Sequence, residues 1–306
     1  MMDDRLQIGI NRVQFYRNAG TLGMSYLLQA LIDSPLFEVE YHDLFHKTHR
    51  DYRGTIITCK DYEIYVDFWE YPAPTFMKKT WERNFDLIVE LQYINMTLEY
   101  FEKYCSRKNL FGFLSSEQKE EFLKKMVPWT FFPSRMMHPY IGNESVLWNK
   151  NIEIDGFFCG KFWKGRHPFL RSLEAQGIET IESSRGEDDF NLLTNEQYFA
   201  KMQTSKYGIV LSGRTSGLTD RKNRREIDYM MMKKPLLMNY QPCYYDPLVP
   251  GKHYIEINQK TQIAAIADLY DIAAIAEEGH QWYKRNATPD GAARLFRRII
   301  YENLHI

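Results

Sequence analysis

The chain has 306 residues, more than one hydrophobic core usually organises, and this length predicts two domains of about 150 residues each. Its 39 basic and 40 acidic side chains give a net charge of -1, which excludes a general electrostatic attraction to nucleic acid or to an anionic membrane. The four cysteines form no C-x-x-C pair, which argues against both a zinc site and a disulfide framework.

The N-terminal residues contain two acids and no apolar stretch long enough for a signal sequence. No later run approaches the roughly 18 consecutive apolar residues that a membrane span needs. We therefore expect a cytoplasmic protein without a membrane span. In that setting the glycosylation sequons at Asn95, Asn143 and Asn286 are chance matches, because the motif is used only in secreted chains.

Strand and helix patterns alternate through the first half of the chain, as they do in βαβ units. A glycine-containing turn at 18–23 separates the first predicted strand from the first predicted helix. The predicted strands are 6–13, 37–44, 55–58, 62–68 and 85–91, and the predicted helices are 22–32, 97–108 and 117–126. These elements predict a Rossmann-like first domain that spans 1–150.

The periodicity fades between 140 and 154, and a second alternating series follows. It comprises predicted strands at 156–160, 179–182, 207–211 and 235–240, and predicted helices at 167–176, 195–205, 224–232, 261–277 and 289–303. We therefore predict a second Rossmann-like domain, 151–306, whose last helix can pack back on the first domain. The predicted fold class is α/β, with two such domains.

Ligands of open parallel sheets bind beyond the carboxyl ends of the strands, where helix N-termini present free backbone N–H groups. Gly160 ends the predicted strand 156–160, and the loop after it carries Lys161, Lys164 and Arg166 before a helix begins. Three cations and a helix dipole together favour a diphosphate. A solvated basic loop is the alternative interpretation.

A second loop with the composition of a phosphate site follows the predicted strand 207–211. Ser212, Gly213 and Arg214 open this loop. Small residues let backbone N–H groups approach a phosphate, and an arginine binds two of its oxygens. The spacing is not that of a P-loop. The loop therefore predicts a further contact to the same diphosphate.

The helix after this loop carries Arg225 and Asp228 three residues apart, so their side chains share one face, while Glu226 points some 100° away. The arginine could hold a phosphate, and the aspartate could accept hydrogen bonds from both hydroxyls of a ribose. A surface ion pair between the two residues, worth a few tenths of a kcal/mol, is the alternative.

The run 205–213, Arg225-x-x-Asp228 and the run 234–238 together resemble the donor-binding half of GT-B glycosyltransferases, with a layout closest to exostosin-like and related sugar transferases. In those families an Arg-x-x-Glu on a helix precedes a small-residue turn, a proline and a buried strand, and the acid binds the donor ribose. Here the acid is an aspartate, and Lys233 stands where a glycine is common.

The resemblance extends over 155–300. It implies two domains facing across a cleft, the first binding a glycan or other hydroxyl acceptor and the second a nucleotide sugar, in a hexosyl- or pentosyltransferase without a cofactor. In an inverting enzyme a base near the acceptor hydroxyl is expected, and the candidates are the strand-end carboxylates of the first domain, Asp67, Glu70 and Glu90. The D-x-D pattern that holds Mg²⁺ in the other common transferase fold is absent from the sequence, so we expect transfer without a metal.

Other interpretations stay open. A non-catalytic nucleotide- or carbohydrate-binding protein could share the two-domain shell, and so could a GT-B-type nucleotide-sugar epimerase with carboxylates and a histidine in its cleft. His42, His46 and His49 fit a polar loop better than a metal site. Any of four scattered tryptophans could stack on a sugar: Trp81, Trp129, Trp148 and Trp163. Trp163, in the basic loop, is preferred, and core packing is the alternative.

Overall fold

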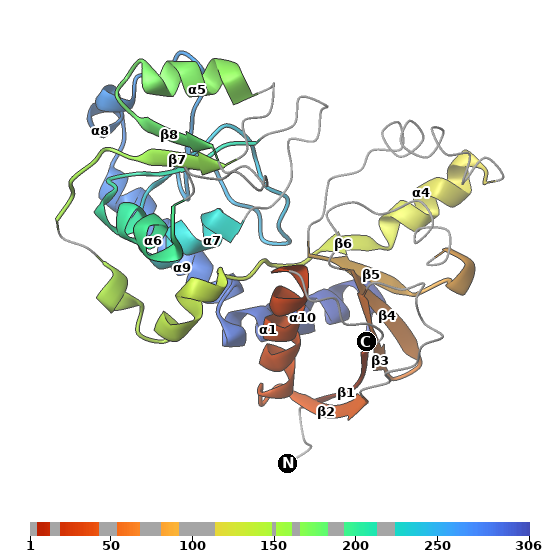
Figure 1. Ribbon diagram of the computed structural model, residues 1–306. Coiled ribbons are helices and arrows are strands. Elements are labelled where there is room, and N and C mark those ends of the chain that lie inside the picture. The colour runs from red at the N-terminus through yellow and green to blue at the C-terminus, as the bar shows by residue number, and fades with distance from the viewer. Residues whose placement is uncertain are drawn as a thin grey trace. The chain divides into compact units, whose positions relative to one another are not determined.

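The computed structural model describes residues 5–12, 19–42, 54–67, 81–91, 114–148, 151–160, 166–182, 193–212 and 224–306. The chain divides into two compact units (Figure 1). Unit 1 comprises Met1–Phe131, Cys243–Tyr245 and Pro289–Ile306, and unit 2 comprises Phe132–Pro242 and Asp246–Thr288. Each unit combines a sheet with helices, which confirms the predicted α/β class. The division falls after Phe131, whereas the sequence placed it near residue 150.

The sheet of unit 1 has its strands in the order β2-β1-β3-β4-β5-β6. They are β1 (Leu6–Arg12), β2 (Phe37–His42), β3 (Gly54–Cys59), β4 (Tyr62–Asp67), β5 (Leu87–Glu90) and β6 (Met126–Pro128). β3 runs antiparallel to β1 and β4, and the other neighbours are parallel. The first five strands lie within a few residues of their predicted positions, because runs of buried apolar residues mark them.

The sequence predicted the start of β6 as the end of a helix. The observed helix α4 (Ser116–Lys124) begins with a capping box, in which Ser115 and Gln118 exchange hydrogen bonds, and it ends before the strand. Pro128 has no N–H to donate, so it closes the short strand at the end of the sheet. The helix predicted at 97–108 lies outside the described residues.

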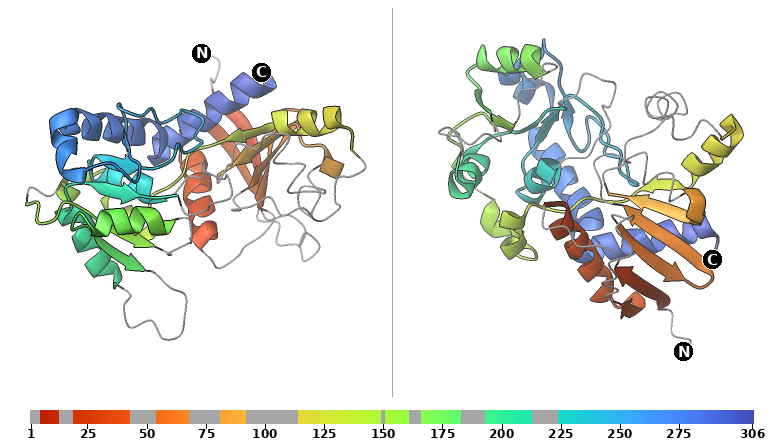
Figure 2. Two further views of the ribbon diagram at one scale, coloured as in Figure 1. Left: turned by 90° about the horizontal axis from the view of Figure 1, so that it is seen from above. Right: turned by 45° about the vertical axis from the view of Figure 1, so that its right-hand side comes forward.

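The last helix of the chain packs in unit 1, beside the first one (Figures 1 and 2). The two helices are α1 (Ala19–Ile32) and α10 (Pro289–Leu304). Trp129 is fully buried, and its indole N–H donates to the carbonyl oxygen of Ala292 at 3.2 Å. The ring centroids of Trp129 and Phe296 lie 4.6 Å apart. The ring of Phe296 also packs against that of Phe37, at the start of β2, with 6.4 Å between centroids. These contacts attach α10 to the sheet.

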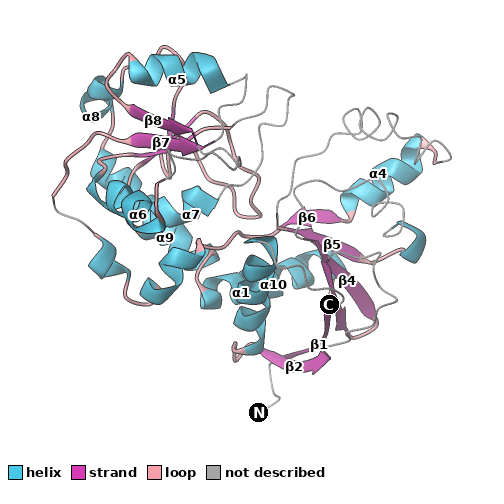
Figure 3. Cartoon of the chain, viewed as in Figure 1, coloured by secondary structure: helices cyan, strands magenta, loops and turns pink. Residues whose placement is uncertain are grey.

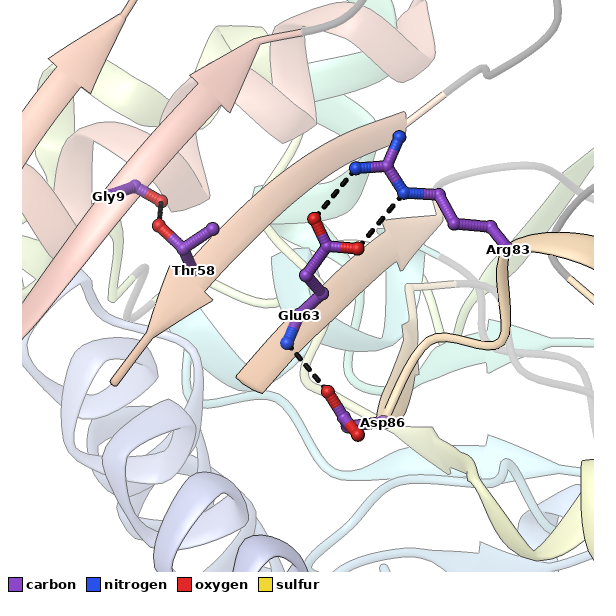
Figure 4. A network of polar contacts seen from close by, with 5 residues as sticks. All are labelled: Gly9, Thr58, Glu63, Arg83 and Asp86. Carbon is purple, nitrogen blue, oxygen red and sulfur yellow. Dashed lines mark hydrogen bonds and ion pairs between the residues drawn. The ribbon is translucent and has the colours of Figure 1, made fainter. Parts of the chain in front are cut away.

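A polar network links three strands of unit 1 to the turn before β5 (Figure 4). Arg83 donates to the carboxylate of Glu63 from Nε at 3.0 Å and from Nη2 at 2.7 Å. The backbone N–H of Glu63 donates to Asp86 Oδ2 at 2.8 Å. Beside Glu63 in the ladder, the hydroxyl of Thr58 donates to the carbonyl oxygen of Gly9 at 3.3 Å. These bonds therefore tie β3 to β1, and β4 to the turn before β5.

We expect Glu63→Gln to lower the free energy of unfolding by about 0.5 kcal/mol at pH 7, because the partly exposed pair with Arg83 is solvent-screened. The hydrogen bond from Arg83 holds the pKa of Glu63 below its usual value. The stabilisation is therefore present above the unfolded pKa and is lost as the pH falls through the folded pKa. Urea denaturation from pH 7 to pH 2 measures this, with the exposed Glu121→Gln as control. A difference that persists undiminished at pH 2 would contradict the prediction.

The described strands of unit 2 run parallel to their neighbours, as the two strands labelled in this unit in Figure 3 illustrate. They are β7 (Phe157–Gly160), β8 (Glu179–Glu182), β9 (Gly208–Val210), β10 (Leu236–Met238) and β11 (Ile255–Glu256). β7 pairs with β8, and β10 pairs with β9 and β11. The segment before β7 runs beside the start of β9, because the N–H groups of Lys206 and Tyr207 donate to the carbonyls of Ile154 and Asp155 at 2.9 Å each. The order β8-β7-β9-β10-β11 is that of a flavodoxin-like doubly wound sheet.

The helices of unit 2 are α5 (His167–Glu174), α6 (Asn195–Thr204), α7 (Arg224–Met231), α8 (Ile266–Leu269) and α9 (Ile272–Asn286), with 3-10 turns at Arg135–Tyr140, Glu144–Leu147 and Ile263–Ala265. The prediction of one continuous helix over 261–277 is wrong. Asp271 accepts a hydrogen bond from the N–H of Ala274 at 3.0 Å, and this N-cap starts a new helix. In the described part of the chain, no helix is long and apolar enough to cross a membrane.

Candidate functional site

The strand order of unit 2 marks one point where a ligand fits. β7 lies between β8 and β9, so the connections after β7 and β8 run to opposite sides of β7. In such sheets ligands bind outside the carboxyl ends of the two strands at this switch point. Gly160 is the last residue of β7, and Leu211 and Ser212 follow β9. The predicted residues Gly160 and Ser212 therefore lie at the switch point.

Two arginines approach Gly160 from different elements. A Cβ atom added to Gly160 would lie 3.0 Å from Nη1 of Arg225, on α7, and 3.4 Å from Nη1 of Arg166, before α5. Both guanidinium groups also lie over the buried ring of Phe158, with Cζ at 5.3 Å for Arg166 and 6.0 Å for Arg225 from its centroid. The missing side chain of Gly160 thus leaves room for two like charges, and such a pair attracts an anion.

Arg166 is fixed by the strand beside it. Its Nη2 donates to the carbonyl oxygen of Leu211 at 2.7 Å, and only 9% of the residue is exposed. α5 begins at the next residue, so the N-terminal N–H groups of this helix lie at the same edge of the sheet. One guanidinium group therefore connects the carboxyl end of β9 with the end of β7.

Arg225 is held among aromatic side chains. Tyr198, on α6, forms a side-chain hydrogen bond with it. Burial raises the pKa of Tyr198 to about 12, although the positive charge of Arg225 acts to lower it. The phenol is therefore neutral at physiological pH and orients the arginine through its hydroxyl. Sequence reasoning did not single out Tyr198, because nothing in its helical segment distinguishes it from a packing residue.

Asp228 lies one helical turn from Arg225 and is 1% exposed. Its Oδ1 accepts the backbone N–H of Ser134 at 2.7 Å. Burial raises the pKa of Asp228 to about 6, against the lowering effects of Ser134 and of the charges of Arg224 and Arg225. This carboxylate, which the sequence predicted to bind a ribose, therefore already accepts a hydrogen bond from the residue that precedes a 3-10 turn. Its binding of a ribose stays a prediction.

Two neighbouring residues after β10 complete the described part of the site. The side-chain oxygen of Asn239 accepts the N–H of Ser212 at 2.7 Å. The hydroxyl of Tyr240 donates to Glu226, which is completely buried. Burial, followed by the charge of Glu226, raises the pKa of Tyr240 well above its usual value. Sequence reasoning missed both residues, although they end the predicted strand 235–240, where site residues of parallel sheets gather.

Several predicted residues lie outside the described part of the chain: Lys161, Lys164, Gly213, Arg214, Glu70, Trp163, His46 and His49. Their contributions stay predictions. Within the described ranges, no group of three or more His, Cys, Asp or Glu side chains could hold a metal ion. Transfer without a metal also stays a prediction.

Two of the three carboxylates predicted as candidate bases lie side by side in unit 1. Asp67 and Glu90 are register partners at the carboxyl ends of the parallel strands β4 and β5. Their exposed fractions are 7% and 4%. The carbonyl of Asp67 accepts the N–H of Leu91 at 2.9 Å, and that of Glu90 accepts the N–H of Trp129 at 3.0 Å, so the backbone fixes both strand ends. The strand-end position that the sequence predicted for them is therefore observed.

Comparison with known proteins gives structural likenesses only. No protein-family model and no curated protein matches the sequence. The chain is similar to HepE of Anabaena, solved in complex with UDP, with a TM-score of 0.43 and 10% identity over 78% of each chain. It is also similar to a glycosyltransferase of Rickettsia africae, with a TM-score of 0.42 and 9% identity over 98% of this chain and 99% of the other.

Proposed function

We propose that the protein is a glycosyltransferase that takes a sugar from a nucleotide-sugar donor, and that Arg166 and Arg225 bind the donor diphosphate over Gly160. The observation that carries this proposal is the approach of two guanidinium groups from different elements to one glycine at the switch point of a parallel sheet. The hexosyl or pentosyl specificity, the hydroxyl acceptor and the exostosin-like layout stay predictions.

The chemistry of sugar transfer explains why two arginines suit this place. As the glycosidic bond to the donor breaks, negative charge accumulates on the leaving diphosphate. Each guanidinium can donate two parallel hydrogen bonds to its oxygens, and a glycine lets the diphosphate approach the backbone closely. Arg166 is already oriented by Leu211, so little freedom is lost when the donor binds. The proposed partner of the donor ribose is Asp228.

In an inverting transferase the acceptor hydroxyl needs a base, and Asp67 and Glu90 are the proposed candidates. They are adjacent and mostly buried, and in the proposed mechanism one of them takes the proton from the attacking oxygen. Asp67→Asn and Glu90→Gln separate the two: the substitution of the base is expected to reduce the transfer rate about 100-fold or more while leaving nucleotide affinity unchanged.

Nucleotide binding tests the proposal. We expect calorimetric titration with UDP and GDP to show binding of one of them to the wild type, and Arg225→Ala to weaken that binding about 100-fold, because two charge-assisted hydrogen bonds are lost. Arg171→Ala, at an exposed position on α5, is the matched control and should bind as the wild type does. Equal affinities in both variants would contradict the assignment.

A transfer assay then separates the enzyme from a binding protein. The preferred nucleotide with its common sugars attached is incubated with hydroxyl acceptors, and mass spectrometry identifies the products. Sugar transfer that persists in a chelator is the expected result. Tight nucleotide binding without release or transfer of sugar would indicate a non-catalytic nucleotide-binding protein, and a donor converted into its epimer would indicate an epimerase.

A further inference from the structure

Unit 2 has a hollow at the edge of its sheet opposite to Gly160. Its volume is about 270 Å³, and residues that precede strands line it: Ile152 before β7, Lys206 before β9 and Pro235 before β10. It therefore lies at the amino ends of these strands, whereas Gly160 lies at a carboxyl end. The parallel direction of the strands keeps the two places apart.

The walls of this hollow are largely apolar. Trp148, Ile152, Met232 and Ile272 line it, and Trp148 and Ile152 are 37% and 48% exposed. The indole of Trp148 is held in place, because its N–H donates to the carbonyl of Met231 at 3.4 Å and its ring meets the edge of another aromatic ring. Exposed apolar side chains around a concavity, one of them a fixed aromatic ring, are typical of a binding site for an apolar group.

The charged lining residues are three lysines, Lys206, Lys233 and Lys234, and none of the described residues lining the hollow is acidic. Lys233 lies with Nζ 4.7 Å from the centroid of Trp148 and is paired with Glu277. The charges of Lys206 and Lys234 remain in excess. Lysine side chains only donate hydrogen bonds, whereas a sugar also requires acceptors for its hydroxyls. The lining therefore favours an anion over a carbohydrate.

Lys234 gives the hollow its most specific feature. It is 5% exposed, and its ammonium group donates to the carbonyl oxygen of Gln203 at 2.6 Å. Burial lowers the pKa of Lys234 to about 8. Removing a charged ammonium group from water costs free energy, and an anion bound beside it offsets part of that cost.

We propose that this hollow binds a small amphipathic carboxylate, with its apolar body against Trp148 and Ile152 and its carboxylate group near Lys234. A water molecule occupies about 30 Å³ in the liquid, so the hollow has room for a ligand of roughly ten non-hydrogen atoms. The site is independent of the proposed nucleotide site, because it uses none of the same residues. Nothing in the glycosyl transfer proposed above requires it.

Octanoate is a suitable probe, and octanol is its neutral counterpart. We expect calorimetric titration of the full chain to show one site for octanoate and at least tenfold weaker binding of octanol. Lys234→Met keeps most of the length of the side chain and removes the charge, so it should weaken octanoate binding at least tenfold. Lys260→Met, at an exposed position away from the hollow, is the control and should bind as the wild type does.

Further measurements keep the test decisive if Lys234→Met does not fold. Lys206→Met should then weaken octanoate binding several-fold, and Trp148→Leu should weaken octanoate and octanol together. Octanol binding as tight as that of octanoate, binding of methyl glucoside in the hollow, or unchanged octanoate affinity in the lysine variants would overturn the proposal. Arg225→Ala should bind octanoate normally, which separates a failure of this site from a failure of the proposed function.

Discussion

Gly208→Ala is expected to destabilise the protein by about 3 kcal/mol, because the added methyl group has no room. A Cβ atom at this position would lie 2.3 to 2.6 Å from three ring atoms of Tyr229, and that ring is 1% exposed. The backbone cannot retreat easily, since Gly208 pairs with Leu236 inside the parallel ladder and its N–H donates to the carbonyl of Pro235 at 3.0 Å. Urea denaturation followed by circular dichroism measures the change.

A double-mutant cycle identifies the cause of that destabilisation. Tyr229→Leu alone removes a large buried ring and is expected to cost stability. In the Gly208→Ala background the same substitution should cost much less, because it relieves the clash. Strictly additive effects would show that the glycine is required for another reason.

Asp228→Asn is expected to raise the free energy of unfolding by about 3 kcal/mol at pH 7. Burial raises the pKa of Asp228 from 3.8 to about 6, so folding takes up a proton between these two values. Stability therefore falls as the pH rises through this window, and the full cost of the buried charge is present above about pH 6. Asparagine keeps an oxygen that can accept the N–H of Ser134 but carries no charge.

The pH dependence of the stability difference between Asp228→Asn and the wild type tests whether the charge is the cause. The advantage of Asp228→Asn should disappear at about pH 4, where the wild-type carboxyl is protonated in the folded state, and the exposed Asp155→Asn should show no such trend. If Asp228 binds the donor ribose, the stabilised variant will also bind the nucleotide more weakly, as expected for a charge retained for function at the expense of stability. A variant less stable than the wild type at pH 7 would show that the charge itself stabilises the fold.

The elements of unit 2 that carry the candidate site could largely be predicted from the sequence. β7, β8, β9, β10 and α7 lie close to their predicted positions, because apolar strands alternate there with amphipathic helices. From the rule that ligands gather after strands, the sequence also indicated Gly160, Arg166 and Arg225, and the structure brings these three residues together. β11 has only two residues, too few for any pattern to appear.

Contacts that depend on packing between distant segments could not be predicted. The bond from Tyr240 to Glu226 and that from Ser212 to Asn239 each join residues on different elements, and no local pattern specifies them. Lys233, at a position where the families that the sequence resembles often have a glycine, has by contrast a local explanation. Its φ of 55° is left-handed, and it closes α7, which explains why a glycine would suit this position.

The chain passes between the two units four times, and the last passage places α10 in unit 1. Trp129 is therefore covered by a residue far later in the sequence, Phe296, and this contact cannot form until Phe296 has left the ribosome. Unit 1 thus cannot be completed before the segments of unit 2 that precede α10 are synthesised, and a fragment cut after Phe131 would expose the indole that α10 covers.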